Sequence, residues 1–318
     1  MSVRALRDRT WLVAVAAAMW GLDGLLRQPL ATTINPATVV LWEHLIAIAI
    51  LLPVVPRAVR AFGRCALRDR VAIAVIGVGA SAVGTALFTE SFALSSRTGD
   101  YLTPLVLQKL QPLLAIALAV RLLRERLRPG FMLFALPALA GAWLLTFADP
   151  LDIKMTEAKA ALFAVGAAAL WASGTVLGRL VSPSVRPADL TTLRYAWGLP
   201  AAWAITWIVG APTAPGWHSL PGLILLALIP GLLALTLYYR ALARTAAARA
   251  TLAELAFPAT AAVVGVLFLN ARLTVTQWVG FAVIVAAITG LGWRERSARP
   301  TVEPAFADAY GASSSIAR

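Results

Sequence analysis

Long hydrophobic stretches alternate with short polar segments along most of the sequence. A helix needs about 20 apolar residues to cross the ~30 Å hydrocarbon core of a bilayer. Runs of roughly this length lie at residues 11–29, 36–56, 71–94, 101–120, 130–148, 160–179, 188–209, 220–242, 250–269 and 276–293. Because lipid offers no hydrogen bonds to a bare backbone, each run should be helical. The pattern therefore predicts an all-α polytopic membrane protein with ten transmembrane helices.

The polar separators divide the chain into segments. Pro36 and Pro187 stand where two of the runs begin, a position at which the missing N–H of proline costs least. We expect a cytoplasmic N-terminus at 1–10, a first five-helix repeat at 11–148, an outer linker at 149–159, a second, inverted five-helix repeat at 160–293 and a cytoplasmic tail at 294–318. The tail is polar, rich in Ser and Ala and weakly patterned, which is typical of disorder.

The charges predict an orientation. Only 14% of the residues are charged, against about 25% in a typical soluble domain. The 28 Lys and Arg outnumber the 15 Asp and Glu, and a net charge of +13 would suggest a nucleic-acid partner in a soluble protein. Most of these cations, however, lie in segments that are cytoplasmic if the N-terminus is inside, and the outer segments hold only Arg97, Lys154, Lys159 and Arg272. The positive-inside rule thus predicts N-in and C-in topology in the cell inner (cytoplasmic) membrane, with no nucleic-acid partner.

The two halves of the chain repeat one another. Trp20 matches Trp171 and Pro36 matches Pro187, and later in each half Pro112 matches Pro258 at nearly the same separation along the chain. Five spans per repeat force the second copy to cross the membrane in the opposite direction. Inverted repeats of this kind characterise many secondary transporters, whose substrate site lies at the repeat interface near the midplane.

Several short motifs suggest a family. Ala93-Leu94 closes the third helix, Pro112 lies within the fourth, and Glu125-Arg126-Leu127 follows it, while Trp20-Gly21 and Arg194-Tyr195 occur in helices one and seven. Over residues 11–293 the chain resembles the EamA-type permeases of the drug/metabolite transporter superfamily. The resemblance implies a ten-helix basket around a central cavity lined by both repeats; most relatives export metabolites or drugs and some import them.

The sequence departs from the family pattern at two places. Ala271 occupies the place that Glu125 has in the first repeat. Glu43 stands where the second repeat has Arg194, which leaves the charge of the substrate open.

Ionisable residues within the spans are the strongest candidates for function. Placing one such side chain in a transmembrane helix costs at least ~2.5–3.5 kcal/mol on insertion scales, so its presence points to a functional or structural role. Asp23, Glu43 and Glu90 fall in three successive helices of the first repeat, all in the outer half of the membrane. Alternatively, Asp23 pairs with Arg27, and Glu90 is solvated at the interface.

The second repeat has other residue types at the positions that correspond to these acids. Asp23 corresponds to Gly174, and Glu90 to Tyr238 or Tyr239. Glu254 corresponds to Gln108, and we expect it to pair with Arg194 or Arg240, either as an inner gate or as a static bridge.

Aromatic and polar residues in the spans complete the candidate site. Trp20 and Trp171 are mid-span and related by the repeat, and aromatic faces attract ammonium groups. His44 is either a satisfied buried histidine or a proton relay. The full set of candidate substrate-binding or cavity residues is Trp20, Asp23, Glu43, His44, Glu90, Tyr101, Gln108, Lys109, Trp171, Arg194, Tyr195, Tyr238, Tyr239 and Glu254.

These features favour a secondary active transporter. A cavity acid that must lose its proton to admit a cation makes proton and substrate compete, so we expect proton-linked export of a small amine-bearing metabolite, an amino acid or organic cation. A facilitator or importer is an alternative, and a membrane enzyme acting on lipid-linked substrates through Asp23, Glu43 and Glu90 is another. The sequence has no Walker A or HExxH motif, two His and one Cys. We expect no cofactor or metal. The expected partners are the bilayer, a small-molecule substrate and the proton as coupling ion. The sequence leaves the oligomeric state open.

Overall fold

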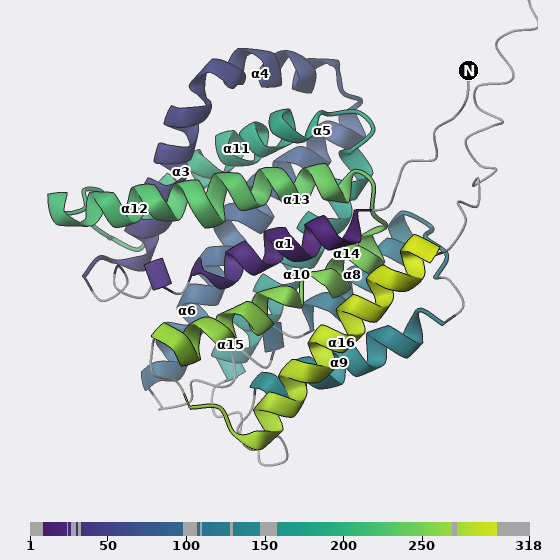
Figure 1. Ribbon diagram of the computed structural model, residues 1–318. Coiled ribbons are helices and arrows are strands. Elements are labelled where there is room, and N and C mark those ends of the chain that lie inside the picture. Colours follow the sequence, from purple (N-terminus) through teal and green to yellow (C-terminus); the bar gives the residue numbers. More distant parts are fainter. Residues whose placement is uncertain are drawn as a thin grey trace, which may run out of the picture.

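The computed structural model describes residues 9–23, 25–26, 30, 33–97, 107–108, 110–127, 130–146, 158–268 and 272–297. All regular secondary structure in these ranges is helical (Figure 1), which confirms the predicted all-α class. The predictions for Arg27, Tyr101 and Lys109, for most of the linker and for the tail beyond residue 297 lie outside the described residues.

The first repeat contains nine of the described elements. They are α1 (Thr10–Gly21), α3 (Pro36–Leu51), the 3-10 turn η1 (Leu52–Val54), α4 (Val55–Arg64), α5 (Leu67–Ala74), the π-helical segment η2 (Val75–Val83), α6 (Gly84–Arg97), α8 (Gln111–Leu122) and α9 (Met132–Thr146). The Asn35 side chain accepts a hydrogen bond from the Ala37 N–H, and Pro36 is the first helical residue of α3. The helix start predicted at Pro36 is therefore confirmed, with a side-chain cap and a proline that needs no partner.

The second repeat also contains nine described elements. They are α10 (Ala158–Val181), α11 (Pro187–Ile208), the 3-10 turn η3 (Trp217–Ser219), α12 (Leu220–Leu226), the π-helical segment η4 (Ala227–Leu233), α13 (Ala234–Leu242), α14 (Ala247–Ala253), α15 (Ala256–Phe268) and α16 (Val275–Ser297).

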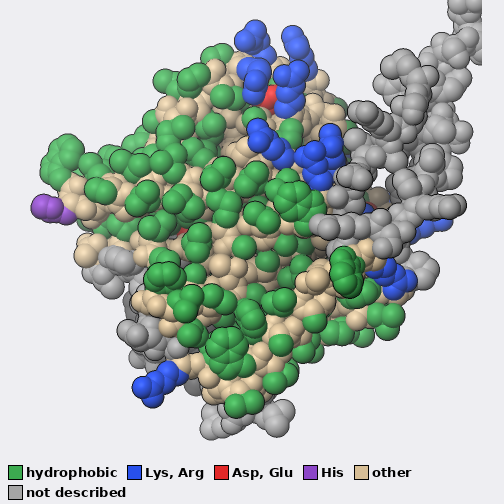
Figure 2. All heavy atoms as spheres, viewed as in Figure 1, with side chains coloured by type: hydrophobic (Ala, Val, Ile, Leu, Met, Phe, Trp, Pro, Cys, Tyr) green, Lys and Arg blue, Asp and Glu red, His purple; other side chains and the backbone are tan. Residues whose placement is uncertain are grey.

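The outer surface is that of a polytopic membrane protein. Among the described residues, five helical stretches are long and apolar enough to cross a membrane: Pro36–Arg64, Leu67–Phe88, Ala158–Val181, Trp217–Leu242 and Ala247–Phe268. Further apolar helices are shorter. The side chains of large hydrophobic residues such as Trp207 and Ile208 are exposed. In Figure 2 hydrophobic side chains cover the middle of the face, and Lys and Arg lie mainly in its upper and right-hand parts and again at the lower left. Such a surface is suited to lipid rather than to water.

The repeats exchange their first helices. Helix α1 packs against α13, α14 and α15 of the second repeat, and α10 packs against η2, α6 and α8 of the first. The second helices, α3 and α11, pack on each other, and so do the fifth helices, α9 and α16, which lie side by side in Figure 1. This reciprocal packing is what two copies related by an approximate twofold axis produce, and it agrees with the predicted pair of repeats around a centre.

Glycines allow the closest of these contacts. A Cβ on Gly280 would lie 2.6 Å from the Gly141 carbonyl oxygen, and a Cβ on Gly141 would lie 2.8 Å from the Gly280 carbonyl oxygen. The backbones of α9 and α16 therefore touch directly, as small residues permit in membrane helices.

Both repeats interrupt their third helix in the same way. Segments η2 and η4 are π-helical, and each occupies the middle of the third helix of its repeat, between α5 and α6 and between α12 and α13. π-helical turns are rare and occur frequently at functional sites. The hydropathy pattern gave no sign of them, because a π-turn preserves the apolar character of the segment.

Polar contacts join the repeats at the end that the sequence predicts to be cytoplasmic. The Arg57 Nε donates to Asp189 Oδ1 at 2.7 Å, and the Ser184 hydroxyl donates to Asp69 Oδ2 at 2.6 Å. Both carboxylates are almost completely buried. In addition, Arg179 Nη1 donates to the Ala243 carbonyl at 2.6 Å. The bonds of Asp189 and Asp69 tie α4 and α5 to the second repeat, and the Arg179 bond joins α10 to the end of α13 within the second repeat.

The motif residue Glu125 caps a helix of the opposite repeat. Its two carboxylate oxygens accept the N–H groups of Ala247 and Ala248 at 2.8 and 3.1 Å, at the start of α14. The preceding Arg124 adopts a left-handed backbone with φ of 52°. Ala271, which takes this place in the second repeat, has no carboxylate to make an equivalent cap.

Candidate transport cavity

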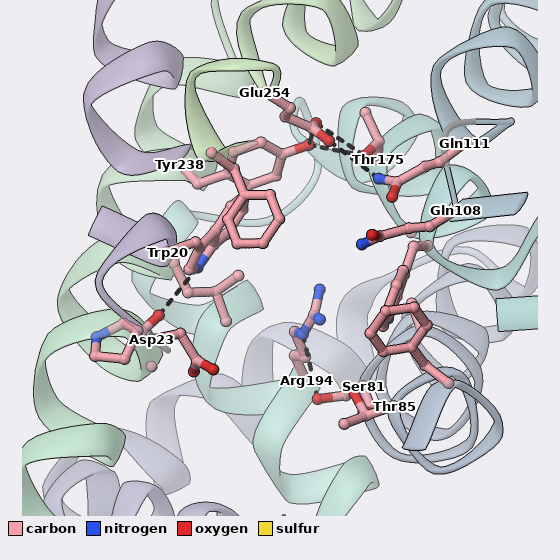
Figure 3. Close-up of a pocket in the computed structure, with 18 of the residues that line it drawn as sticks. Trp20, Asp23, Ser81, Thr85, Gln108, Gln111, Thr175, Arg194, Tyr238 and Glu254 are labelled. Carbon is pink, nitrogen blue, oxygen red and sulfur yellow. Dashed lines mark hydrogen bonds between the residues drawn. The ribbon is translucent and has the colours of Figure 1, made fainter. Parts of the chain in front are cut away.

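A cavity of about 370 Å³ lies between the two repeats (Figure 3). Helices and segments of both halves line it: α1, α3, η2, α6 and α8 from the first, and α10, α11, η4, α13, α14 and α15 from the second. The cavity therefore lies at the repeat interface, the location typical of the substrate site in transporters built from inverted repeats.

Most of the residues selected from the sequence meet in this cavity. The lining includes Trp20, Asp23, Glu43, His44, Gln108, Trp171, Arg194, Tyr195, Tyr238 and Glu254. They come from helices that are far apart in the sequence and adjacent in space.

The structure does not bring Glu90 or Tyr239 to the lining. Glu90 is exposed, whereas Thr85 and Phe88 of the same helix face the cavity. Because successive helical residues are rotated by about 100°, a residue two positions after Phe88 lies on the opposite side of α6. The prediction that Glu90 lines the cavity together with Asp23 and Glu43 is therefore wrong. Tyr239 is buried behind the lining, where its hydroxyl contacts Arg194.

Glu254 is held by three neutral donors. The Tyr238 hydroxyl donates to Glu254 Oε1 at 2.7 Å, the Thr175 hydroxyl approaches the same oxygen at 3.1 Å, and Gln111 Nε2 donates to Oε2 at 3.2 Å. Figure 3 shows this group along one wall of the cavity. The donors come from α13, α10 and α8, so one carboxylate joins three helices of the two repeats.

The expected ion pair of Glu254 is not formed. Within the described part of the chain, Glu254 has no salt bridge with Arg194 or Arg240. Arg240 is exposed, on the side of α13 away from the cavity. Neutral donors from neighbouring helices satisfy the carboxylate instead, and the sequence alone does not reveal them, since Thr and Tyr are common in membrane helices.

Arg194 begins a chain of hydrogen bonds that ends at a backbone carbonyl. Its Nε donates to Ser81 Oγ at 3.3 Å, and Ser81 Oγ lies 2.9 Å from His44 Nε2. His44 Nδ1 lies 2.8 Å from the Val40 carbonyl, which can only accept, so Nδ1 carries a proton. In the neutral ring Nε2 then accepts from the Ser81 hydroxyl. His44 is thus a buried histidine with both nitrogens satisfied, one of its two predicted roles.

The two repeat-related tryptophans contact the third helix of the opposite repeat. The Trp20 Nε1–H donates to the Pro230 carbonyl of η4 at 3.0 Å, and its ring lies 5.1 Å from that of Tyr238. The Trp171 ring lies 5.0 Å from the Phe88 ring of α6. Both tryptophans also line the cavity, so they connect it to the regions around the two π-helical segments.

Sequence reasoning missed several lining residues. These are mainly small hydroxyl, amide and aromatic side chains: Ser81, Thr85, Phe88, Gln111, Thr175, Thr251 and Phe257. A weak signal existed for Gln111, because it follows Gln108 by three positions and therefore shares its helical face. The hydroxyl residues carried no such signal, since single Ser and Thr residues occur throughout membrane helices.

Comparisons with known proteins agree with this architecture. The model of the EamA-like transporter family matches residues 10–147 and again 158–293. A crystal structure that is 20% identical in sequence superimposes with a TM-score of 0.72, covering 92% of this chain and all of the other, and supports the fold.

Two curated relatives match part of the chain. The riboflavin transporter ImpX of Fusobacterium nucleatum subsp. nucleatum is 30% identical over 190 residues, which are 58% of this chain and 62% of that protein. The uncharacterized transporter YwfM of Bacillus subtilis (strain 168) is 24% identical over 187 residues, 56% of this chain and 59% of that protein. The match thus spans about three fifths of each relative. These names and the twofold family match indicate transport rather than the membrane enzyme considered as an alternative, and the chain belongs to the EamA-like transporter family.

Proposed function

We propose that this transporter exports small amine-bearing metabolites in exchange for protons, by alternating access of the central cavity. The observation that carries the proposal is the placement of Asp23 and Glu43 in a cavity that both repeats enclose. A carboxylate at this site can hold either a proton or a substrate ammonium, so the two compete. Such competition couples the two flows in opposite directions.

The walls of the cavity suit an amine. Trp20, Trp171 and Tyr238 present aromatic rings to it, and a cation over an aromatic face gains about 0.5–2 kcal/mol. The Trp20 N–H is engaged by the Pro230 carbonyl and the Tyr238 hydroxyl by Glu254, so their rings are what they offer to a ligand.

Orientation is part of the proposal. Placing Arg57, Arg60 and Arg64 of the α4 region in the cytoplasm follows the positive-inside rule, so we place both termini inside, in the inner membrane. In this orientation the contacts of Asp69 and Asp189 with the opposite repeat close the cytoplasmic end. Opening toward the cytoplasm would have to break them.

A second candidate substrate is a planar heteroaromatic metabolite. The relative ImpX is named a riboflavin transporter. The cavity combines rings such as Phe88 and Trp171 with the amides of Gln108 and Gln111, and stacking with amide hydrogen bonding is how proteins hold flat nitrogen heterocycles. In this reading the carboxylates couple protons without contacting the substrate.

Counterflow with purified protein in liposomes distinguishes the two candidates. Vesicles loaded with unlabelled compound are diluted into labelled phenylalanine or labelled riboflavin, and uptake above that of protein-free vesicles identifies the substrate. The proposal expects exchange of phenylalanine, a loss of at least about tenfold with Glu43→Gln, and no loss with Glu90→Gln, whose carboxylate is outside the cavity. Exchange of riboflavin alone, or a Glu43→Gln variant as fast as the parent, would contradict it.

A further inference from the structure

Among the residues that the structure describes, Arg194 faces the cavity without forming an ion pair. Arg194 lies in the middle of the lining, and its end points toward the centre of the cavity in Figure 3. The described residues give it two hydrogen bonds, from Nε to Ser81 and from Nη1 to the Tyr239 hydroxyl at 3.1 Å. Both acceptors are neutral. A guanidinium has five N–H donors, so three of them have no acceptor in the described residues.

We propose that Arg194 forms a carboxylate-binding subsite, with Gln108 as a second donor. The inference rests on the proposed function and narrows its substrate class, from amines in general to molecules that also carry a carboxylate. Gln108 lies across the cavity and, in Figure 3, its amide is directed toward the same central space as Arg194. Guanidinium–carboxylate bonds are charge-assisted and frequently bidentate, and are roughly twice as strong as neutral hydrogen bonds.

In the described part of the chain, Glu254 forms no ion pair with Arg194. Glu254 lines the same cavity, but its oxygens accept from Tyr238, Thr175 and Gln111, and no ion pair joins it to Arg194. In the described residues, the Ser81 hydroxyl links Arg194 to His44. A charge inside a membrane protein is costly unless it is compensated. A substrate carboxylate would supply that compensation when it binds.

The ammonium group of a zwitterion would also meet a suitable partner in the cavity. Asp23 lies on the other side of the cavity from Gln108 in Figure 3. A molecule whose carboxylate meets Arg194 would direct its ammonium toward Asp23 and the Trp20 ring. The subsite therefore distinguishes an amino acid from the corresponding amine or amide, which would leave the guanidinium uncompensated.

The test compares phenylalanine with phenylalaninamide, which keeps the ammonium and the ring but lacks the carboxylate. Each competes against labelled phenylalanine in counterflow with the parent protein, Arg194→Gln, Arg194→Lys and the matched control Arg240→Gln, whose arginine is exposed outside the cavity. We expect the parent and Arg240→Gln to prefer phenylalanine over the amide by at least about tenfold. Arg194→Gln should reduce this ratio to near one, and Arg194→Lys should keep an intermediate preference, because an ammonium supplies charge without the planar fork. Equal competition by the two compounds in the parent, or an unchanged ratio in Arg194→Gln, would overturn the subsite.

A binding measurement separates failure of the subsite from failure of the proposed function. If phenylalanine is not exchanged at all, the thermal unfolding of the purified protein is followed with millimolar benzoate and with benzamide. Stabilisation by benzoate alone, reduced in Arg194→Lys, lost in Arg194→Gln and kept in Arg240→Gln, would support a carboxylate site in a protein with another substrate. Equal or no stabilisation by the two compounds would overturn it. The Lys variant keeps the test valid if Arg194→Gln does not fold.

Discussion

At the scale of single residues, the cavity shows how buried polar groups find partners across the repeat interface. Sequence reasoning identified Glu254 and Arg194 because charges are rare in spans. It could not assign their partners, since Thr175 and Tyr238 belong to other helices and become neighbours only in the folded chain. Conversely, Glu90 had the right residue type and depth but lies on the wrong side of its helix.

The hydroxyl of Tyr238 should stabilise the fold through Glu254. Tyr238→Phe removes the shortest of the bonds to this carboxylate, and a hydrogen bond to a charged group typically contributes about 1.5–3 kcal/mol. We expect a lower unfolding temperature in detergent, measured by tryptophan fluorescence. The matched control is Thr251→Val, because the buried Thr251 hydroxyl has no hydrogen-bond partner in the described residues. A Tyr238→Phe protein as stable as Thr251→Val would show that the bond contributes little.

The thiol of Cys65 should react slowly. Burial, followed by the nearby Asp69 carboxylate, raises the pKa of the Cys65 thiol, with Arg70 opposing the shift; the Sγ–H donates to the Ala61 carbonyl at 3.2 Å. Because the thiolate is the reactive form, a raised pKa lowers the rate at neutral pH. We predict alkylation by N-ethylmaleimide slower than that of free cysteine, rising with pH beyond the range in which free cysteine levels off. A rate equal to that of free cysteine between pH 6 and 8 would contradict this.

At the scale of elements, the hydropathy pattern predicted helices well and their internal breaks poorly. The starts of α3 and α11 at Pro36 and Pro187 follow from local chemistry. The π-helical segments η2 and η4 contact the opposite repeat instead, as in the bond from Trp20 to Pro230. Such contacts leave no periodic trace in the sequence.

Adding a side chain at Gly280 should destabilise the packing of α9 on α16. A Cβ there would lie 2.5 Å from the Leu145 nitrogen and 2.6 Å from the Gly141 oxygen, so Gly280→Ala must separate the helices. Overpacking of this kind typically costs about 1–3 kcal/mol. The expected result is a clear fall in unfolding temperature. Gly63→Ala is the control, because a Cβ at Gly63 in α4 meets nothing within 4 Å and alanine favours a helix. Equal stability of the two variants would contradict the packing.

At the scale of the whole molecule, the inverted repeat was predictable because its anchors are large or rigid residues. Trp20, Trp171, Pro112 and Pro258 keep their spacing in both halves, and all four line the cavity. An odd number of spans in each repeat then fixes the inversion. The exchange of α1 and α10 between the repeats could not be read in the same way, because hydropathy contains no information on which helices pack together.

Cysteine mapping checks the proposed orientation of the molecule. On a Cys65→Ala background, single cysteines replace the exposed residues His218 and Arg64, which lie at opposite ends of the helices. With both termini inside, a membrane-impermeant maleimide should label His218→Cys in intact cells and Arg64→Cys only after lysis. The reverse labelling would invert the orientation and with it the proposed cytoplasmic closure by Asp69 and Asp189.

The most direct test of the account is accumulation driven by a proton gradient. Liposomes containing the purified protein are prepared with an acidic interior and placed in a neutral medium with labelled phenylalanine. If protons and substrate exchange through one cavity, protons leaving the vesicles should drive the label to an internal concentration above the external one, and nigericin should abolish this accumulation. Label that only equilibrates, at a rate and to a level independent of the gradient, would contradict proton-coupled antiport.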